Sequence, residues 1–437
     1  MGGSTVSFGL APPAKLAVAA RALASLLVLL VAAVSAPLAT AHATGPALEG
    51  YPGGSLQALV DNAQPGDHIQ LHTGTYVGQV IINHSGAPGL PITIEPFGDG
   101  PVTVTASFPV EPCNNSKPAP NRTFYAAGGV DYWTIQGLNI VNGIWLSGAN
   151  FDVVAPWFHH LADIHDWQTR RSLPGRGTND PTTARGVYAA LSTKLGVAVD
   201  PATGWRILNN NISGRGFHGT VTTDGELAGN TIHDIDCGIG PGAWLVTFSD
   251  FWNVHHNRVS FVAASTYRHY MQEGIRFGSA SNYNRIEYNT VSDLPGDGRA
   301  ITTDIDASYN TFQRNSVMRT NFAFNDQQSG WGNNWLYNTA DSVRGAAFVF
   351  RGADAKLRLP SKNSSTYRAQ VRCNRVTNTR LAMTAGALIE STFMSNYFKH
   401  VTLSPNLLNY WSQYNNTWNG STTPPAAYPS QPVAGSC

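Results

Sequence analysis

A recurring asparagine behind short strand-like runs is the feature that most constrains how this chain can fold. Seven hexapeptides place an asparagine after a short run of mixed apolar and polar residues. They are LAGNTI, VHHNRV, IEYNTV, FQRNSV, WLYNTA, VRCNRV and FMSNYF. The intervals are irregular, but they fall within the roughly 20 to 45 residues that one unit of a repeat protein takes. The asparagines are Asn230, Asn257, Asn289, Asn315, Asn338, Asn374 and Asn396.

This series predicts an all-β chain that coils as a right-handed parallel β-helix. Rungs would stack at the strand spacing of about 4.8 Å, and each asparagine could then hydrogen-bond to the asparagines above and below it. We therefore interpret the series as a structural ladder. A β-propeller would need longer, four-stranded blades, and a leucine-rich repeat would need its leucine pattern.

Three segments are expected along the chain. Residues 1–43 have the form of a secretory signal peptide, with Lys15 and Arg21 before an apolar run at 22–34 and AHA at 41–43. Residues 44–420 form the β-helix, which begins with a short capping helix at 55–63, and 421–437 form a proline-rich tail. The mature protein is expected to be secreted, extracellular, monomeric and free of membrane.

Charge and cysteine content narrow the partners and the redox environment. The formal net charge is +1 and 13% of the residues are charged, so no bulk attraction to nucleic acid is expected. Four cysteines in an exported chain favour disulfides, with three pairings possible. The cysteines are Cys113, Cys237, Cys373 and Cys437, and we favour Cys373 with Cys437, because that bond would fix the tail.

The opening rungs carry a family resemblance. The segment LQALVDNAQPGDHIQLHTGTYVGQVIINHSGAPGLPITIEPFGDGPVTV resembles the first rungs of secreted, pectate-lyase-like carbohydrate-active β-helix proteins, above all the chondroitinase B and alginate lyase family. The shared features are the capping helix, the PGD turn, GTY, and SGAPGLPITI followed by GDGPVTV. The resemblance implies a polysaccharide partner. Glu273 and Arg299 match that family's glutamate and arginine, but Gly278 stands near its expected lysine, and no lysine lies between Lys194 and Lys356.

The asparagines also give a register from which a site can be predicted. The residues 13 positions before each asparagine should turn their side chains outward. The residues 14 positions before it are mostly apolar and should turn their side chains inward. The outward set is Phe217, Trp244, Arg276, Thr302 and Asn325. The same counting brings Glu273, Arg276, Arg299 and Asp304 onto neighbouring rungs, although an ordinary cross-strand ion pair would explain Glu273 and Arg299 equally well.

Candidate roles follow from these side chains and their neighbours in the sequence. The candidate catalytic residues are Arg276, Glu273, Arg299, His269, Tyr270 and Asp304. The candidate substrate-binding residues are Trp244, His218, Asp326 and Asp297. Asp304 and Asp306 in DIDAS are candidate Ca²⁺ ligands, although the motif lacks the glycine and distal glutamate of an EF-hand. No other cofactor is expected.

Three functions fit this pattern. A polysaccharide lyase acting on a uronate-containing polymer by β-elimination would use the arginines as a carboxylate clamp and a histidine or tyrosine as base or acid. A glycoside hydrolase would need a pair of carboxylates. A non-catalytic glycan-binding surface protein would need neither, and has little reason to gather both signs of charge on one face.

Overall fold

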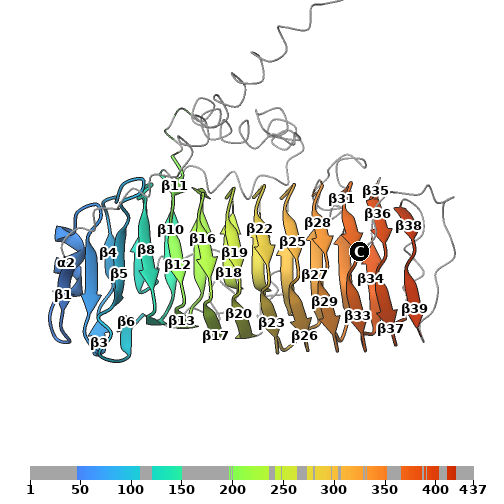
Figure 1. The fold of residues 1–437 in the computed structure, drawn as a ribbon, viewed down its shortest axis with the longest axis horizontal. Coiled ribbons are helices and arrows are strands. Elements are labelled where there is room, and N and C mark those ends of the chain that lie inside the picture. Colours follow the sequence, from blue (N-terminus) through green and yellow to red (C-terminus); the bar gives the residue numbers. More distant parts are fainter. Residues whose placement is uncertain are drawn as a thin grey trace, which may run out of the picture. The chain divides into compact units, whose positions relative to one another are not determined.

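The chain forms a parallel β-helix, which confirms the predicted fold (Figure 1). The computed structural model describes residues 47–108, 121–149, 196, 198, 200–235, 242–247, 249–262, 273–278, 281–296, 298–303, 307–327, 330, 332–351, 366–385, 388–389, 391–402 and 411–419. These residues belong to one compact unit, Thr44–Cys437. Strands of three long sheets follow one another as the chain advances, and every pairing within the sheets is parallel across the described ranges.

Sheet A is the first of the three long sheets and has thirteen strands in the described part of the chain. Its strands are β1 (Ala47–Gly50), β2 (His68–Leu71), β5 (Ile92–Pro96), β8 (Trp133–Gln136), β12 (Arg206–Leu208), β16 (Glu226–Ala228), β19 (Asn253–His255), β22 (Arg285–Glu287), β25 (Thr311–Gln313), β28 (Asn334–Leu336), β32 (Gln370–Arg372), β36 (Ser391–Met394) and β38 (Trp411–Tyr414).

Sheet B follows sheet A in each rung. Its strands are β3 (Gly74–Val77), β6 (Val102–Thr105), β9 (Asn139–Val141), β13 (Asn211–Gly214), β17 (Thr231–Ile235), β20 (Arg258–Val262), β23 (Thr290–Ser292), β26 (Ser316–Met318), β29 (Thr339–Asp341), β33 (Arg375–Thr377), β37 (Tyr397–Lys399) and β39 (Thr417–Asn419).

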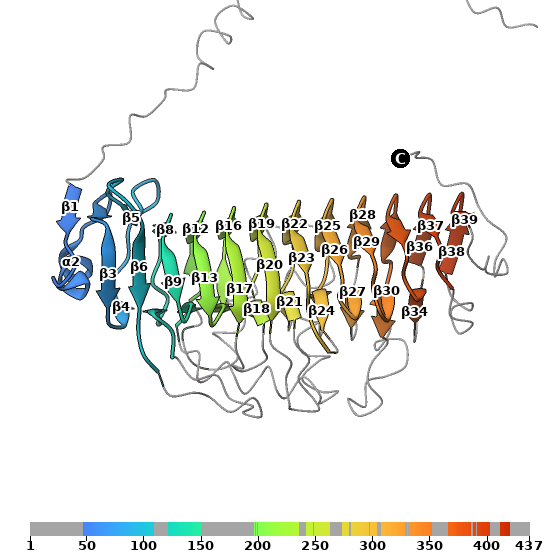
Figure 2. The ribbon, with the colours of Figure 1, turned by 90° about the horizontal axis from the view of Figure 1, so that it is seen from below.

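Sheet C completes the rung and runs along the lower edge of the coil in Figure 2, opposite the sheet A strands at the upper edge. Its strands are β4 (Val80–Ile82), β7 (Phe124–Ala126), β10 (Ile144–Ser147), β14 (Phe217–Thr220), β18 (Gly242–Thr247), β21 (Glu273–Gly278), β24 (Arg299–Thr303), β27 (Phe322–Gln327), β30 (Ala346–Arg351) and β34 (Leu381–Ala385). Two small pairs stand apart from the long sheets: β11 (Ala202–Thr203) with β15 (Thr222–Thr223), and β31 (Thr366–Tyr367) with β35 (Leu388–Ile389).

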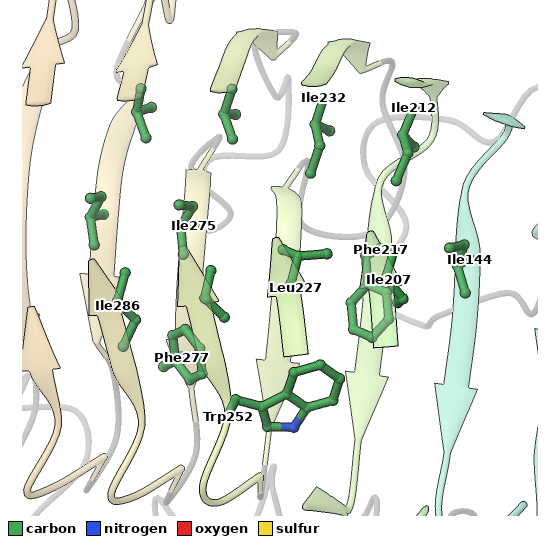
Figure 3. Packing of buried hydrophobic residues seen from close by; sticks show 14 of the residues in the cluster. Ile144, Ile207, Ile212, Phe217, Leu227, Ile232, Trp252, Ile275, Phe277 and Ile286 are labelled. Atoms are coloured by element: carbon green, nitrogen blue, oxygen red, sulfur yellow. The ribbon is translucent and has the colours of Figure 1, made fainter. Parts of the chain in front are cut away.

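Apolar side chains from all three sheets fill the interior of the coil. Figure 3 shows Ile207 and Leu227 of sheet A, Ile232 of sheet B, and Phe217 and Ile275 of sheet C turned toward a common core. Each of these side chains is at most 1% exposed. The burial of this continuous column removes apolar surface from water and is the main force that holds the rungs together.

The predicted asparagine ladder is confirmed, and hydrogen bonds extend it at both ends to Asn210 and Asn416. Asn257 shows the repeated pattern: its backbone N–H and its Nδ2 both donate to Oδ1 of Asn289, at 3.0 and 2.9 Å. Its Nδ2 also donates to the carbonyl of Leu227 in the preceding rung, at 2.9 Å. The ladder thus satisfies backbone groups that the corner would otherwise bury without partners.

The corner that carries this ladder has a constant length. From β12 onward, two residues separate each described strand of sheet A from the sheet B strand that follows it. The second of them is the ladder asparagine, and the first has a positive φ, for example 56° at His256 and 53° at Arg314. This left-handed residue turns the chain sharply. Since the turn never lengthens, the asparagine keeps its place in every rung.

A helix and an aromatic stack close the N-terminal end. Helix α2 (Leu56–Asn62) confirms the predicted capping helix, and the hydroxyl of Ser55 accepts a hydrogen bond from the N–H of Ala58 at 3.1 Å. The helix turns the buried side chains of Leu56 and Val60 toward the interior. It thereby covers apolar surface that the first rungs would otherwise expose.

Beside this helix, Tyr51 and Phe97 stack on the two faces of His72, with ring centroids 4.2 and 4.1 Å away. The Nδ1 atom of His72 lies 2.7 Å from Oδ2 of Asp99, and Nε2 lies 3.5 Å from Oε2 of Glu49. The hydrogen bond to Asp99 is the main cause of a raised pKa at His72. The imidazole of His72, between two aromatic rings and two carboxylates, therefore joins the first three rungs.

Several predictions concern residues outside the described part of the chain. The proposed signal peptide and the proline-rich tail lie there, as do Cys113, Cys237 and Cys437, so the boundaries and the Cys373–Cys437 pairing stay predictions. No helix within the described ranges is long and apolar enough to cross a bilayer.

Candidate functional site on the outer face of sheet C

Sheet C departs from strict alternation of inward and outward side chains. Ala300 and Ile301 are consecutive residues of β24 and both belong to the core, and Ala323 and Phe324 of β27 repeat this arrangement. The residues on either side of such a pair therefore face outward together, although they are three positions apart. In β21 the pair is Gly274 and Ile275, where a Cβ on Gly274 would meet the core side chain of Val291.

This local break brings Glu273 and Arg276 onto the same outer face. Oε2 of Glu273 lies 3.2 Å from Nη1 of Arg276, and Oε1 lies 3.6 Å from Nη1 of Arg299 on the next rung. The side chains of Glu273, Arg276 and Arg299 are 5%, 17% and 9% exposed. One carboxylate thus lies between two guanidinium groups, and all three are largely withdrawn from water. Such charges interact far more strongly than an exposed surface pair.

A histidine lies on the same outer face, two rungs before Arg276. In the register of the sheet, His218 pairs with Leu245, and Leu245 pairs with Arg276. The indole of Trp145 stacks on the imidazole of His218 with ring centroids 4.2 Å apart and an interplanar angle of 5°. Oγ1 of Thr220 lies 3.4 Å from Nε2 of His218. The ring is therefore held in one plane by its neighbours.

The surroundings of His218 keep its imidazole neutral. Burial is the largest cause that lowers its pKa to about 3, and the positive charges of Arg122 and Arg276 lower it further. Arg122 is itself buried, and both Arg122 and Arg215 donate to the carbonyl of Asn121, at 3.1 and 2.7 Å. The outer face of sheet C therefore carries a cluster of guanidinium groups around one carboxylate and one neutral histidine.

The row of outward side chains continues beyond Arg276 with two polar residues. Arg276 pairs with Thr302, and Thr302 pairs with Asn325. Both side chains are buried, at 0% and 1% exposed. The same row passes through Trp145 and His218 at its other end, so described side chains from β10, β14, β21, β24 and β27 lie along one line parallel to the axis.

The structure corrects the prediction for Phe217. This residue is in the core, so it does not face outward with Arg276. Counting back from the asparagine misplaced it, because the chain from sheet C to the ladder is one residue shorter in its rung: Ile275 is 14 positions before Asn289, whereas Phe217 is 13 before Asn230. The backbone of Trp244 pairs with Phe217 and with Ile275, and the substrate-binding role of Trp244 stays a prediction.

Asp326 is placed differently from the substrate-binding role predicted for it. It is 1% exposed and one residue after outward-facing Asn325, and its Oδ2 accepts a hydrogen bond from Nδ2 of Asn333 at 3.1 Å. Nε1 of the core residue Trp335 lies 3.5 Å from the same oxygen. The alternation of the strand turns this carboxylate into the coil, where it supports the corner.

The remaining predicted site residues are outside the described part of the chain. These are His269, Tyr270, Asp297, Asp304 and Asp306. Within the described ranges, no group of three or more His, Cys, Asp or Glu side chains is arranged to hold a metal ion. Because both candidate Ca²⁺ ligands, Asp304 and Asp306, are among the undescribed residues, calcium stays a prediction.

Sequence reasoning missed Trp145 and Arg122. The segments GIWLS at 143–147 and GFHGT at 216–220 both place a bulky side chain and then an aromatic or imidazole ring after a glycine. That likeness could have placed Trp145 in the row of His218, and the structure pairs the two residues directly. Arg122 precedes β7, and no repeat in the sequence indicates its direction.

Comparisons with known proteins add solved structures of low similarity. No family model and no curated protein matches the chain. A GH136 lacto-N-biosidase from Eubacterium ramulus is 13% identical with a TM-score of 0.47; the match covers 84% of this chain and 64% of the lacto-N-biosidase. An alginate lyase from Paenibacillus sp. str. FPU-7 is 14% identical, with a TM-score of 0.42 and coverage of 86% and 99%.

A mannuronic acid specific polysaccharide family 6 lyase from human gut microbiota is also 14% identical, with a TM-score of 0.46 and coverage of 84% and 86%. All three TM-scores are below 0.5. The assignment of the fold therefore stands on the parallel sheets of the chain itself, and the reaction has to be argued from the side chains of sheet C.

Proposed function

We propose that this protein is a secreted polysaccharide lyase that cleaves a uronate-containing polymer by β-elimination on the outer face of sheet C. The observation that carries the proposal is the gathering of Arg276, Arg299 and Arg122 around Glu273 and His218. Guanidinium groups are planar donors that suit the carboxylate of a uronate. The solved structures named as lyases act on polymers of this kind, and their low similarity leaves the proposal resting on this face.

The chemistry of elimination explains why arginines would be gathered there. A base removes the proton next to the uronate carboxylate, and negative charge develops on that carboxylate. The bond from the neighbouring carbon to the bridging oxygen then breaks, a carbon–carbon double bond forms, and the leaving oxygen takes a proton. Preorganised positive charge at the carboxylate lowers the barrier to the first step.

Each described side chain has a proposed part in this reaction. Arg276 and Arg299 would bind the uronate carboxylate, with Glu273 holding both guanidinium groups in place. His218 is neutral at ordinary pH, so it can accept a proton, and the bound carboxylate would offset the guanidinium charges that lower its pKa. His269 or Tyr270 would supply the proton to the leaving oxygen.

Hydrolysis and simple binding are the outcomes to be distinguished from elimination. A hydrolase needs two carboxylates on the substrate face. In the described part of that face we find Glu273, which is engaged by two arginines, while Asp326 is turned into the coil. The preference for elimination rests on the guanidinium groups that surround Glu273, since Asp297, Asp304 and Asp306 lie outside the described residues.

The test is incubation with alginate, polygalacturonate, chondroitin sulfate and a neutral glucan. Elimination is measured as the ultraviolet absorbance of an unsaturated uronate, and it should appear with at least one uronate polymer. New reducing ends without that absorbance would establish hydrolysis instead, and binding without either product would establish a glycan-binding protein.

Variants connect the activity to the proposed site. Arg276→Met should reduce the rate by about 10²–10³-fold, the typical effect of removing one stabilising donor. The matched control is Arg285→Met, because Arg285 is 62% exposed on sheet A, and it should retain the wild-type rate. Full activity in Arg276→Met would place the reaction elsewhere on the chain.

A further inference from the structure

Two buried polar groups on sheet C lack hydrogen bonds. In the part of the chain that the structure describes, neither Oγ1 of Thr302 nor Nδ2 of Asn325 has a hydrogen-bond partner. The two residues are 0% and 1% exposed, and they are neighbours in the outward row that begins at Arg276. Both atoms can donate a hydrogen bond, and the hydroxyl can also accept one.

Such groups are costly, because each loses its hydrogen bonds to water without gaining others. Native proteins satisfy the great majority of their buried polar atoms, and the exceptions call for an explanation. Other described side chains also have a buried atom without a hydrogen bond, for example Oγ1 of Thr134 on sheet A, but Thr302 and Asn325 are direct neighbours in one row. The ladder asparagines, by contrast, make several hydrogen bonds each.

The neighbouring threonine shows that the position on the strand makes the difference. Thr303 is the next residue of β24, and its Oγ1 donates to the carbonyl of Ala307 at 3.3 Å. Thr303 is also fully buried. Two adjacent threonines with the same burial therefore differ in one respect: the second has a partner, and the first, in the row of Arg276, has none among the described residues.

We propose that Thr302 and Asn325 form a binding subsite for hydroxyl or carboxylate oxygens of a bound polysaccharide, on the C-terminal side of Arg276. The inference rests on the proposed function in so far as the ligand is a polysaccharide. Successive rungs advance by about 4.8 Å, which is comparable to the length of one hexopyranose unit. A chain lying along the axis would thus present one sugar to the arginines and the next sugars to Thr302 and Asn325.

The subsite explains why unsatisfied groups are kept at these positions. A site built to hydrogen-bond a ligand strongly disfavours analogues that leave its polar groups unpaired. Thr302 and Asn325 would accordingly select polymers whose sugars next to the cleaved bond carry a free oxygen facing sheet C. The stability lost in the free protein is recovered when the polymer binds.

The experiment compares Thr302→Val and Asn325→Leu, which keep the approximate shape and remove the polar atom, with the control Thr303→Val. Two quantities are measured for each protein: the midpoint of thermal unfolding without ligand, and the dissociation constants for alginate, polygalacturonate, chondroitin sulfate and a neutral glucan. Thr302→Val should raise the midpoint by roughly 1–4 °C, and Thr303→Val should lower it. Thr302→Val and Asn325→Leu should each weaken polymer binding by roughly threefold to tenfold, and Thr303→Val should leave binding unchanged.

The outcomes separate this inference from the proposed function. If the wild-type protein releases unsaturated uronate while Thr302→Val and Asn325→Leu bind as tightly as wild type, the subsite is wrong and the function stands. If the protein binds only the neutral glucan and both variants weaken that binding, the function is wrong and the subsite stands. A lower unfolding midpoint for Thr302→Val, similar to that of Thr303→Val, overturns the subsite, and so does a wild-type protein that binds no polymer.

Discussion

The charge cluster of Glu273, Arg276 and Arg299 predicts a large loss of stability when Glu273 is replaced by glutamine. Glu273→Gln keeps the size of the side chain and removes the negative charge from between two guanidinium groups at 3.2 and 3.6 Å. Because the three side chains are between 5% and 17% exposed, the substitution leaves two cations in a poorly solvated place. Removing one partner of a buried ion pair typically costs about 3–5 kcal/mol.

The energy of this perturbation is best measured locally, because the rungs of a solenoid need not unfold as one cooperative unit. Hydrogen exchange of the amides in β21 and β24 reports the free energy of opening these rungs. A loss of about 3–5 kcal/mol corresponds to an acceleration of exchange of more than a hundredfold. Amides in β2 and β5, far along the coil, should exchange as in wild type.

A matched control and a double mutant make the result interpretable. Glu287→Gln changes the same residue type on sheet A, where its partner Arg285 is 62% exposed, and it should cost about 0–1 kcal/mol. In Glu273→Gln with Arg299→Gln, the two effects should not add, with a coupling of about 0.5–3 kcal/mol. If Glu273→Gln leaves exchange in β21 and β24 within threefold of wild type, the cluster is a solvated surface pair and our reasoning about it is refuted.

Three further predictions test other parts of the molecule. The pKa of His72 is raised in the folded protein, so the stability that His72 contributes is complete below its unfolded pKa and is lost as the pH rises through its folded pKa. Between pH 6 and pH 9 the thermal midpoint of the wild type should therefore fall more than that of His72→Gln. Equal falls in the two proteins would contradict this prediction. Asn289→Leu removes four ladder hydrogen bonds and should cost about 3–5 kcal/mol by chemical denaturation, against less than about 1 kcal/mol for the outward-facing Asn334→Ala. The ring of His218 should stay neutral in NMR titrations from pH 5 to pH 8. Its pKa should rise in Arg276→Met, because one of the positive charges that lower it is gone. An unchanged pKa in this variant would show that Arg276 does not act on His218.

The sequence was informative where the geometry of the coil is constant. The corner between sheets A and B always has two residues in the rungs from β12 onward, so the asparagines identify every rung. From them the pairing of Glu273 with Arg299 could be predicted, and the structure has this pairing. The fold could therefore be predicted from the ladder asparagines, whose side chains form hydrogen bonds with backbone groups at the corner.

The site was harder to predict, because the length of the connection from sheet C back to sheet A is not constant: it varies by single residues in the rungs of β14 to β27 and by much more after β10 and β30. A difference of one position between the rungs of Phe217 and Ile275 reverses which side chain faces outward, and for this reason Phe217 was misplaced. The consecutive inward pair at Gly274 and Ile275 also has no signature in a pattern of strict alternation. Counting from the asparagines did group Glu273 with Arg276, and the structure brings them to 3.2 Å, but strict alternation would have placed residues three positions apart on opposite faces.

The constant corner between sheets A and B has a consequence for how such a protein can change over time. Residues can be added to or removed from the connections at either end of a sheet C strand, and the asparagine spine remains in register because it lies on another edge. A new substrate preference can therefore arise by insertion, without repacking of the interior. In laboratory evolution, libraries that vary the length of these connections should yield a larger share of folded proteins than libraries that lengthen the asparagine corner.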